Sequence, residues 1–379
     1  MDVTAPRAGP EAQPAAPPTN ARAWVPAALV LTGTVVSLIG LSWDAQWHAD
    51  VGPDTFFTLP HLFLYSGSAM SGLASLAVVL ATTAARRSGK LIDPAVGGRS
   101  VGVFGKTFTA PLGYLVSGTG AALFLLYGLW DQWWHTLYGF DAVLESPPHI
   151  GLMLSITVTM VGSVMVFAAA KRYRWSTPGL VLSTVVLLSF NVVTVLGLQM
   201  LNGVVNAFLA GMAFMVVLIW FVLGGFTRRG GALLAAAVGL TVSQVLLWWF
   251  SPWAARVYAD MVNLPLRDYV DGVPAVPALI PMSVIPVAAL VEAILWAGRK
   301  GMLSTKVATA VAGVVGGMLT ATLFPLQLKL VYGGPLPGAA ELLATGVVAA
   351  GLGLLAALTG RRFGALLSRL SPEARWQQA

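Results

Sequence analysis

The chain contains no cysteine among its 379 residues. This absence excludes disulfide bonds, metal sites built on thiolates, and iron–sulfur clusters held by cysteine. Charged residues are also scarce, at 10% of the sequence, whereas soluble domains contain about 25%. The hydrophobic share of 57% and the mean hydropathy of +0.78 instead indicate an integral membrane protein.

Apolar runs recur along the whole chain, each near the roughly 20 residues that a helix needs to cross a bilayer. They lack the alternating pattern of barrel strands, so we expect helices. The predicted fold class is all-α, a polytopic membrane helix bundle with about ten transmembrane helices. The candidate spans are residues 24–45, 60–85, 108–133, 148–170, 178–201, 205–226, 231–250, 274–297, 306–328 and 337–359.

Composition divides the chain into four segments. Residues 1–22 are rich in proline and alanine and are expected to form a disordered cytoplasmic tail. The first apolar run begins near Trp24 and is long enough to span, so no cleavable signal peptide is expected. Residues 23–170 are predicted to form two duplicated helical hairpins and 171–360 a C-terminal bundle of about six helices. Residues 361–379 are predicted to form a second cytoplasmic tail.

The basic residues predict the orientation of the chain in the cell membrane. With the spans above, all but three of the 22 lysines and arginines fall on the side that also holds both termini. The three exceptions are Arg256, Arg267 and Lys329. The positive-inside rule then predicts that both termini are cytoplasmic. The net charge of +7 therefore reflects topology and does not indicate a nucleic-acid partner.

The four histidines of the chain occur in two copies of one Asp/His/His pattern. In each copy the first histidine follows the aspartate by four residues, so both side chains share one helix face. The second histidine follows a proline at the start of the next predicted helix. Each hairpin can therefore offer one carboxylate and two imidazoles at its outer end. The copies are Asp44, His48 and His61, and Asp131, His135 and His149.

This pattern is most simply explained as a pair of metal sites. Two nitrogens and one oxygen suit copper, iron, zinc or nickel and leave coordination positions open. Asp54 and Asp141 occupy similar positions in the two outer loops. Each is expected to be either a further metal ligand or an acceptor that orients a histidine N–H. An alternative is a metal or proton-coupled transporter or permease that uses the same Asp/His groups as a pathway.

The motif spacing resembles that of the C subunit of the particulate methane and ammonia monooxygenases, which are copper-dependent membrane enzymes. The first copy reproduces the Asp-x3-His-x12-His copper motif of that subunit. The second copy matches its Asn-x3-His-x13-His pattern, except that Asp131 stands at the asparagine position. The resemblance covers roughly residues 36–165.

The resemblance implies copper as the cofactor, with iron or zinc as alternatives. It implies a metal-dependent membrane monooxygenase that uses dioxygen to oxidise a small or lipophilic substrate near the outer membrane face. The six motif residues would then be both metal ligands and the catalytic site. It also implies companion subunits or a homo-oligomer, and a metal-binding subunit of a larger oxidase remains an alternative.

Outside the motifs the sequence offers weaker signals. Residues 251–272 are predicted to form the longest outer loop of the C-terminal half. This loop is expected either to cover the metal site as a lid or to bind a partner protein. Gln327 is expected either to line the cavity of the metal motifs or to hold helices together. Glu292 is expected to pack helices or snorkel near the cytoplasmic end. Trp43 and Trp47 are expected to belong to an interfacial aromatic belt.

Overall fold

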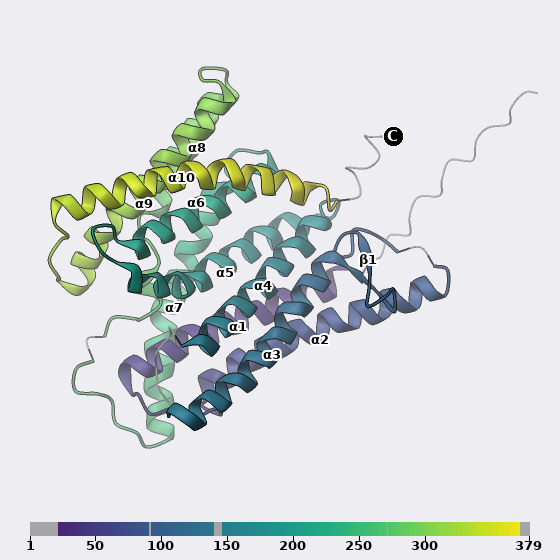
Figure 1. Ribbon diagram of the computed structural model, residues 1–379, viewed down its shortest axis with the longest axis horizontal. Coiled ribbons are helices and arrows are strands. Elements are labelled where there is room, and N and C mark those ends of the chain that lie inside the picture. Colours follow the sequence, from purple (N-terminus) through teal and green to yellow (C-terminus); the bar gives the residue numbers. More distant parts are fainter. Residues whose placement is uncertain (1–21, 91, 140–145, 271, 372–379) are drawn as a thin grey trace, which may run out of the picture.

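The computed structural model describes residues 22–90, 92–139, 146–270 and 272–371. Within these ranges it contains ten long helices, all apolar enough to cross a membrane, and one small β-hairpin (Figure 1). The all-α polytopic membrane bundle is therefore confirmed. The predicted tail 1–22 lies almost entirely outside the described residues. The helices are α1 (Trp24–Asp50), α2 (Leu59–Arg87), α3 (Leu112–Tyr138), α4 (Pro147–Ala169), α5 (Ser176–Leu196), α6 (Ala207–Thr227), α7 (Ala232–Met261), α8 (Val284–Arg299), α9 (Thr305–Tyr332) and α10 (Ala339–Ser368).

The first four helices form a bundle in which α1 packs against α2 and α4, and α3 packs against the same two helices (Figure 1). Helix α7 covers another side of α1, and α5 lies against α4. In the C-terminal part, α10 packs between α6 and α9, and α8 packs on α9. One hydrophobic core extends from Ala27 in α1 to Ala357 in α10. The boundary between the predicted hairpin segment 23–170 and the predicted C-terminal bundle 171–360 stays a prediction.

The two N-terminal hairpins repeat the same contact between their helices. The Ser71 hydroxyl donates to the Val30 carbonyl at 3.1 Å, across α1 and α2. The Thr159 hydroxyl lies 3.4 Å from the Ser117 carbonyl, across α3 and α4. Each hydroxyl follows the second histidine of its motif by ten residues. The equivalent contacts support an internal duplication of the hairpin.

Glycine allows the helices of both hairpins to approach closely. A Cβ on Gly33 would lie 2.3 Å from Ser71 Oγ, and a Cβ on Gly120 would lie 2.4 Å from the Thr159 backbone nitrogen. Small residues at helix crossings are the usual means of close packing in a membrane. The crossing points therefore fix the distance between the two helices of each hairpin, and with it the distance between the motif residues that they carry.

The helix ends near the histidines follow from local sequence. Pro60 lies at the second residue of α2, and Pro147 and Pro148 open α4, where a missing N–H costs no intrahelical bond. Helix α3 ends at Gly139, which has a left-handed φ of 83° and whose N–H bonds to the His135 carbonyl at 3.0 Å. All four histidines thus lie within the first or last turns of their helices.

Two local predictions were wrong. Residues 108–111 do not begin a helix, because β2 (Phe108–Pro111) pairs with β1 (Ser100–Val103) in an antiparallel hairpin before α3. Residues 251–261 do not form a loop, because α7 continues through Pro252 to Met261. Packing explains the second error: Ser251 Oγ and Ser42 Oγ share a hydrogen bond of 2.7 Å between α7 and α1. This contact and the aromatic rings beyond it hold the helix together past the proline.

The two tryptophans of the first motif do not belong to a surface belt. Trp43 is 6% exposed and Trp47 is 1% exposed. Both rings contact Tyr258 of α7, with centroids 5.9 Å and 4.8 Å away. By contrast, Trp130 and Trp133 of the second motif are 37% and 54% exposed, as a belt position requires. The extension of α7 buries the tryptophans of the first motif and leaves those of the second facing outward.

Two candidate metal centres

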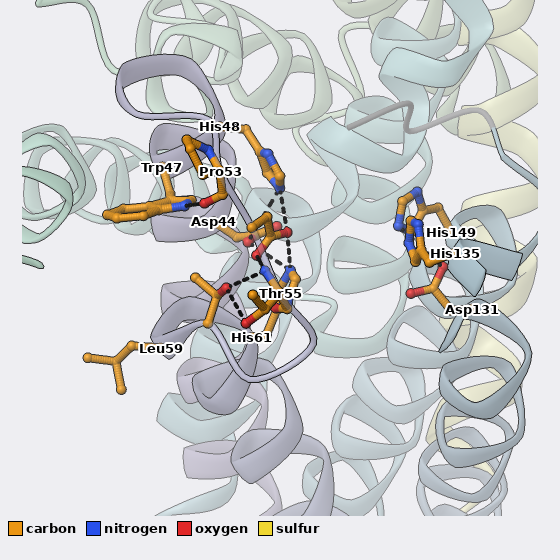
Figure 2. Close-up of polar contacts among 12 residues, drawn as sticks. Asp44, Trp47, His48, Pro53, Thr55, Leu59, His61, Asp131, His135 and His149 are labelled. Atoms are coloured by element: carbon orange, nitrogen blue, oxygen red, sulfur yellow. Dashed lines mark hydrogen bonds and ion pairs between the residues drawn. The ribbon is translucent and has the colours of Figure 1, made fainter. Parts of the chain in front are cut away.

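The first candidate centre forms where α1 ends and α2 begins. Asp44 and His48 lie one turn apart on α1, and His61 is the third residue of α2. The connecting loop contributes Asp54. Figure 2 shows the imidazoles of His48 and His61 converging on the carboxylates between them. The four residues that the first motif and its loop predicted are therefore brought to one point.

The distances in this first centre fit a shared metal ion. His61 Nε2 lies 3.1 Å from Asp44 Oδ1 and 3.3 Å from Asp54 Oδ2. His48 Nε2 lies 3.2 Å from Asp54 Oδ2 and 3.9 Å from Asp44 Oδ1. Ligands bound tetrahedrally at about 2.1 Å would stand about 3.4 Å apart. One ligand atom from each residue lies within 4.8 Å of all the others, so small shifts would close the four around one ion.

Backbone contacts orient His61 as a ligand. Its Nδ1 lies 3.0 Å from the Thr55 carbonyl oxygen. Because a carbonyl can only accept, Nδ1 carries a proton and Nε2 faces the carboxylates, where loss of its own proton would free a lone pair for a metal ion. Asp44 Oδ1 is buried and has the Nε2 atoms of His61 and His48 as close polar neighbours, at 3.1 and 3.9 Å. A buried carboxylate oxygen in that state fits a position opposite a cation.

The loop that carries Asp54 is anchored to α1. The Trp47 indole N–H donates to the Pro53 carbonyl at 2.7 Å, and the Thr55 N–H donates to Asp54 Oδ1 at 2.7 Å. Burial would raise the pKa of the Asp54 carboxyl, but the hydrogen bond with His48 and the charge of His61 outweigh it and hold that pKa below its ordinary value. Asp54 is therefore ionised and ready to bind a cation.

The second candidate centre repeats this geometry between α3 and α4. His135 Nε2 lies 3.5 Å and His149 Nε2 lies 3.4 Å from Asp131 Oδ1. His135 Nδ1 lies 3.0 Å from the Gly139 carbonyl, so a backbone acceptor again directs Nε2 into the cluster. The three residues form a separate group in Figure 2. Asp141, the counterpart predicted for Asp54, lies outside the described residues.

Sequence reasoning did not identify Tyr65, which lies between the two centres. Its ring centroid is 6.0 Å from that of His61 and 6.0 Å from that of Phe124 on α3. The charges of both Asp44 and Asp131 act on its phenol. Tyr65 follows His61 by four residues, so helical spacing could have placed it beside the first centre. Its position next to the second centre depends on the packing of α2 against α3.

Gln327 is not part of either centre. Its side-chain oxygen accepts from the Met282 N–H at 2.7 Å, and its amide nitrogen donates to the carbonyls of Ala278 and Ile280 at 2.7 and 3.0 Å. These bonds satisfy the irregular backbone between the 3-10 turn η2 (Pro277–Leu279) and α8. Of the two roles expected for Gln327, the structure therefore places it in holding elements together.

Comparison with protein-family models, curated proteins and solved structures finds no match to the chain. The two clusters offer donor sets of two imidazoles with two carboxylates, and of two imidazoles with one carboxylate, among the described residues. With neutral imidazoles, the first set carries a charge of −2 and the second −1. Such nitrogen and oxygen sets suit copper, iron or zinc.

Proposed function

We propose that the protein is an integral membrane metalloenzyme that binds copper at both clusters and uses dioxygen to oxidise a small or lipophilic substrate. The observation that carries this proposal is the repeated convergence of two imidazole Nε2 atoms on a carboxylate at ligand spacing. In both copies a backbone carbonyl holds one histidine in its ligating orientation. The match of both motifs to the spacing in a copper monooxygenase subunit supports the same conclusion.

Copper is the metal that this donor set and the resemblance favour together. Imidazole nitrogen binds Cu(II) more strongly than the other divalent ions of the first transition row, and thiolates are absent. Bound copper would pass electrons from an external reductant such as ascorbate to dioxygen, which a side chain alone cannot do. Iron remains compatible with the carboxylate-rich first cluster, and zinc would bind without supplying redox chemistry.

The protein's own contribution is to orient the ligands and to exclude water. Trp43 is buried against Phe63 and Phe250, and Trp47 against Tyr258, so aromatic rings close one side of the first centre. Dry surroundings strengthen the attraction between an ion and its carboxylates. By the positive-inside rule we place both centres toward the non-cytoplasmic face, where a lipophilic substrate enters from the bilayer.

Metal analysis with electron paramagnetic resonance tests the proposal directly. Protein purified without chelators and loaded with Cu(II) should hold one ion per cluster and give a spectrum with nitrogen hyperfine coupling. His48→Ala and His135→Ala should each lose one ion, because each removes one of the two nitrogens of a cluster. Asp260→Asn, an exposed carboxylate on α7, is the matched control and should keep both. Full metal content in both histidine variants would remove the basis of the proposal.

A second experiment separates an oxidase from a metal carrier. Copper-loaded protein in sealed vesicles, supplied with ascorbate and a candidate lipophilic substrate, should consume dioxygen above the rate of the His48→Ala/His135→Ala variant. Copper accumulation inside the vesicles without oxygen consumption would instead identify a carrier. The location of both clusters at one end of their helices favours a fixed site, because a carrier needs ligands along its path.

A further inference from the structure

A cavity of about 440 Å³ lies among the ends of the five C-terminal helices. It is formed where α6, α8 and α10 approach their last turns and where α7 and α9 begin. Successive helices run in opposite directions, and α1 and α3 end at the metal clusters. The cavity is therefore at the opposite end of the bundle from both clusters. Four arginines and one glutamate line it: Arg228, Arg229, Arg299, Arg361 and Glu292.

The single carboxylate of this cavity is already engaged. Glu292 Oε1 accepts from the backbone N–H groups of Gly231 at 2.9 Å and Leu233 at 3.1 Å, at the start of α7. Glu292 Oε2 lies 3.5 Å from an Arg299 guanidinium nitrogen. Glu292 therefore neutralises Arg299 and caps a helix, which agrees with the helix-packing role expected for it. It leaves the charge of the other arginines uncompensated.

The remaining three arginines give the cavity a charge of +3. In the part of the chain that the structure describes, neither Arg228, Arg229 nor Arg361 forms an ion pair with a carboxylate. The Arg361 guanidinium donates to the hydroxyl of Thr309, which fixes it at the cavity wall. Arg228 adopts a left-handed φ of 54°, which glycine usually occupies at a helix end. An arginine in that conformation, at the rim of a cavity, points to a role for its side chain.

The other walls of the cavity are apolar. Phe221, Leu233, Leu295 and Ala308 line it together with the arginines. A ligand that fits would therefore combine a negative head with a hydrocarbon body. Guanidinium groups bind phosphate oxygens with paired hydrogen bonds. Basic pockets between transmembrane helices at their cytoplasmic ends are a known form of lipid headgroup site.

We propose that this cavity binds the phosphate headgroup of an anionic phospholipid. The three unpaired arginines contact the phosphate, and the apolar wall between α6 and α8 receives the glycerol and the first part of an acyl chain. The position of the cavity at the helix ends places it at headgroup depth in a bilayer. This site is independent of the metal clusters, so neither proposal depends on the other.

Thermal unfolding in lipid nanodiscs tests this proposal. Phosphatidylglycerol added to phosphatidylcholine nanodiscs should raise the Tm of the wild-type protein, and the Arg228→Gln/Arg361→Gln variant should lose most of that rise. Lys300→Gln/Lys306→Gln is the matched control, because it removes two positive charges from the same end of the bundle outside the cavity lining. The control should keep the rise. Equal losses in both variants would indicate diffuse charge attraction and would overturn the proposal.

A binding measurement separates a lipid from a free anion. Short-chain phosphatidylglycerol in detergent should bind the wild-type protein at least tenfold more tightly than inorganic phosphate does, and more tightly than the arginine variant binds the lipid. If inorganic phosphate binds as tightly as the lipid, the site is a soluble-anion site and the lipid assignment is wrong. An Arg228→Lys/Arg361→Lys variant keeps the charge. It should recover part of the lipid affinity, which verifies that a loss in the glutamine variant does not come from misfolding.

Discussion

A single methyl group at the crossing of α3 and α4 should disrupt the second metal centre. In a Gly120→Ala variant the new Cβ would lie 2.4 Å from the Thr159 backbone nitrogen and 2.6 Å from the Ser155 carbonyl oxygen. These are backbone atoms and cannot rotate away, so the two helices must separate. Carbon contacts become comfortable only at about 3.5 Å. The required shift is therefore about 1 Å, across the interface that brings His135 and His149 together.

The size of the effect follows from two opposing terms. Overpacking a close contact costs about 1–3 kcal/mol, whereas replacing glycine by alanine inside a helix contributes about 1 kcal/mol of stability. Gly128 on the same helix provides the matched control, because its Cβ would meet only Leu152 Cδ2, at 4.0 Å. Gly128→Ala should therefore be neutral or stabilising, and the two variants should differ by about 1–3 kcal/mol in the free energy of unfolding.

Thermal unfolding in detergent measures the difference in stability, and copper content measures the effect on the site. Gly120→Ala should unfold at a lower temperature than Gly128→Ala and should retain the ion of the first centre while losing or weakening that of the second. Metal–ligand distances in proteins vary by only about 0.2 Å, so a helix separation of about 1 Å that extends to the ligands would weaken the site. If Gly120→Ala matched Gly128→Ala in both Tm and copper content, the inferred link between helix spacing and the second site would be refuted.

Three further predictions concern the supports of the first centre and the C-terminal half. Asp54→Ala should lower copper affinity at the first centre by about 10- to 100-fold in a chelator competition, whereas Asp260→Ala should not change it. Trp47→Phe keeps an aromatic ring but removes the N–H donor that anchors the loop of Asp54 and leaves a small cavity, so the same titration should show a smaller loss together with a fall in Tm of a few degrees. Gln327→Leu removes the hydrogen bonds to the Met282 N–H and the Ala278 carbonyl, whereas the Ile280 carbonyl keeps a donor in Gln244; the change should cost about 1–3 kcal/mol in denaturant unfolding. Thr322→Val, a half-buried change on the same helix that removes only the bond to the Met318 carbonyl, should cost little; equal losses would argue against the role of the amide.

The number and order of the helices were predictable from composition, but several helix ends were not. A bilayer requires about 20 apolar residues per span, and this requirement alone located all ten helices. It gives no information on where a helix stops outside the hydrocarbon. Helix α7 extends to Met261 because its Tyr258 and Ser251 pack against α1, and those contacts depend on tertiary structure. Residues 108–111 form a strand because residues 100–103 are available to pair with them.

The candidate ligands were predictable because their spacing is tied to helix geometry. Residues four apart on α1 and α3 must share a face, and a proline placed the third group at the start of the next helix. The acceptors that orient His61 and His135 were not predictable, since the carbonyls of Thr55 and Gly139 depend on how each chain segment turns. A backbone carbonyl has no signature in residue type. The location of Tyr65 beside both centres likewise depends on the packing of α2 against α3.

The two centres repeat one residue pattern but differ in their surroundings. Among the described residues, the first contains a second carboxylate, Asp54, whose pKa is held below its ordinary value. The hairpins also differ at the fourth residue after the second histidine, which is Tyr65 in the first copy and Met153 in the second. Tyr65 therefore places a hydrogen-bonding and redox-capable phenol near both clusters, which Met153 of the second hairpin cannot do.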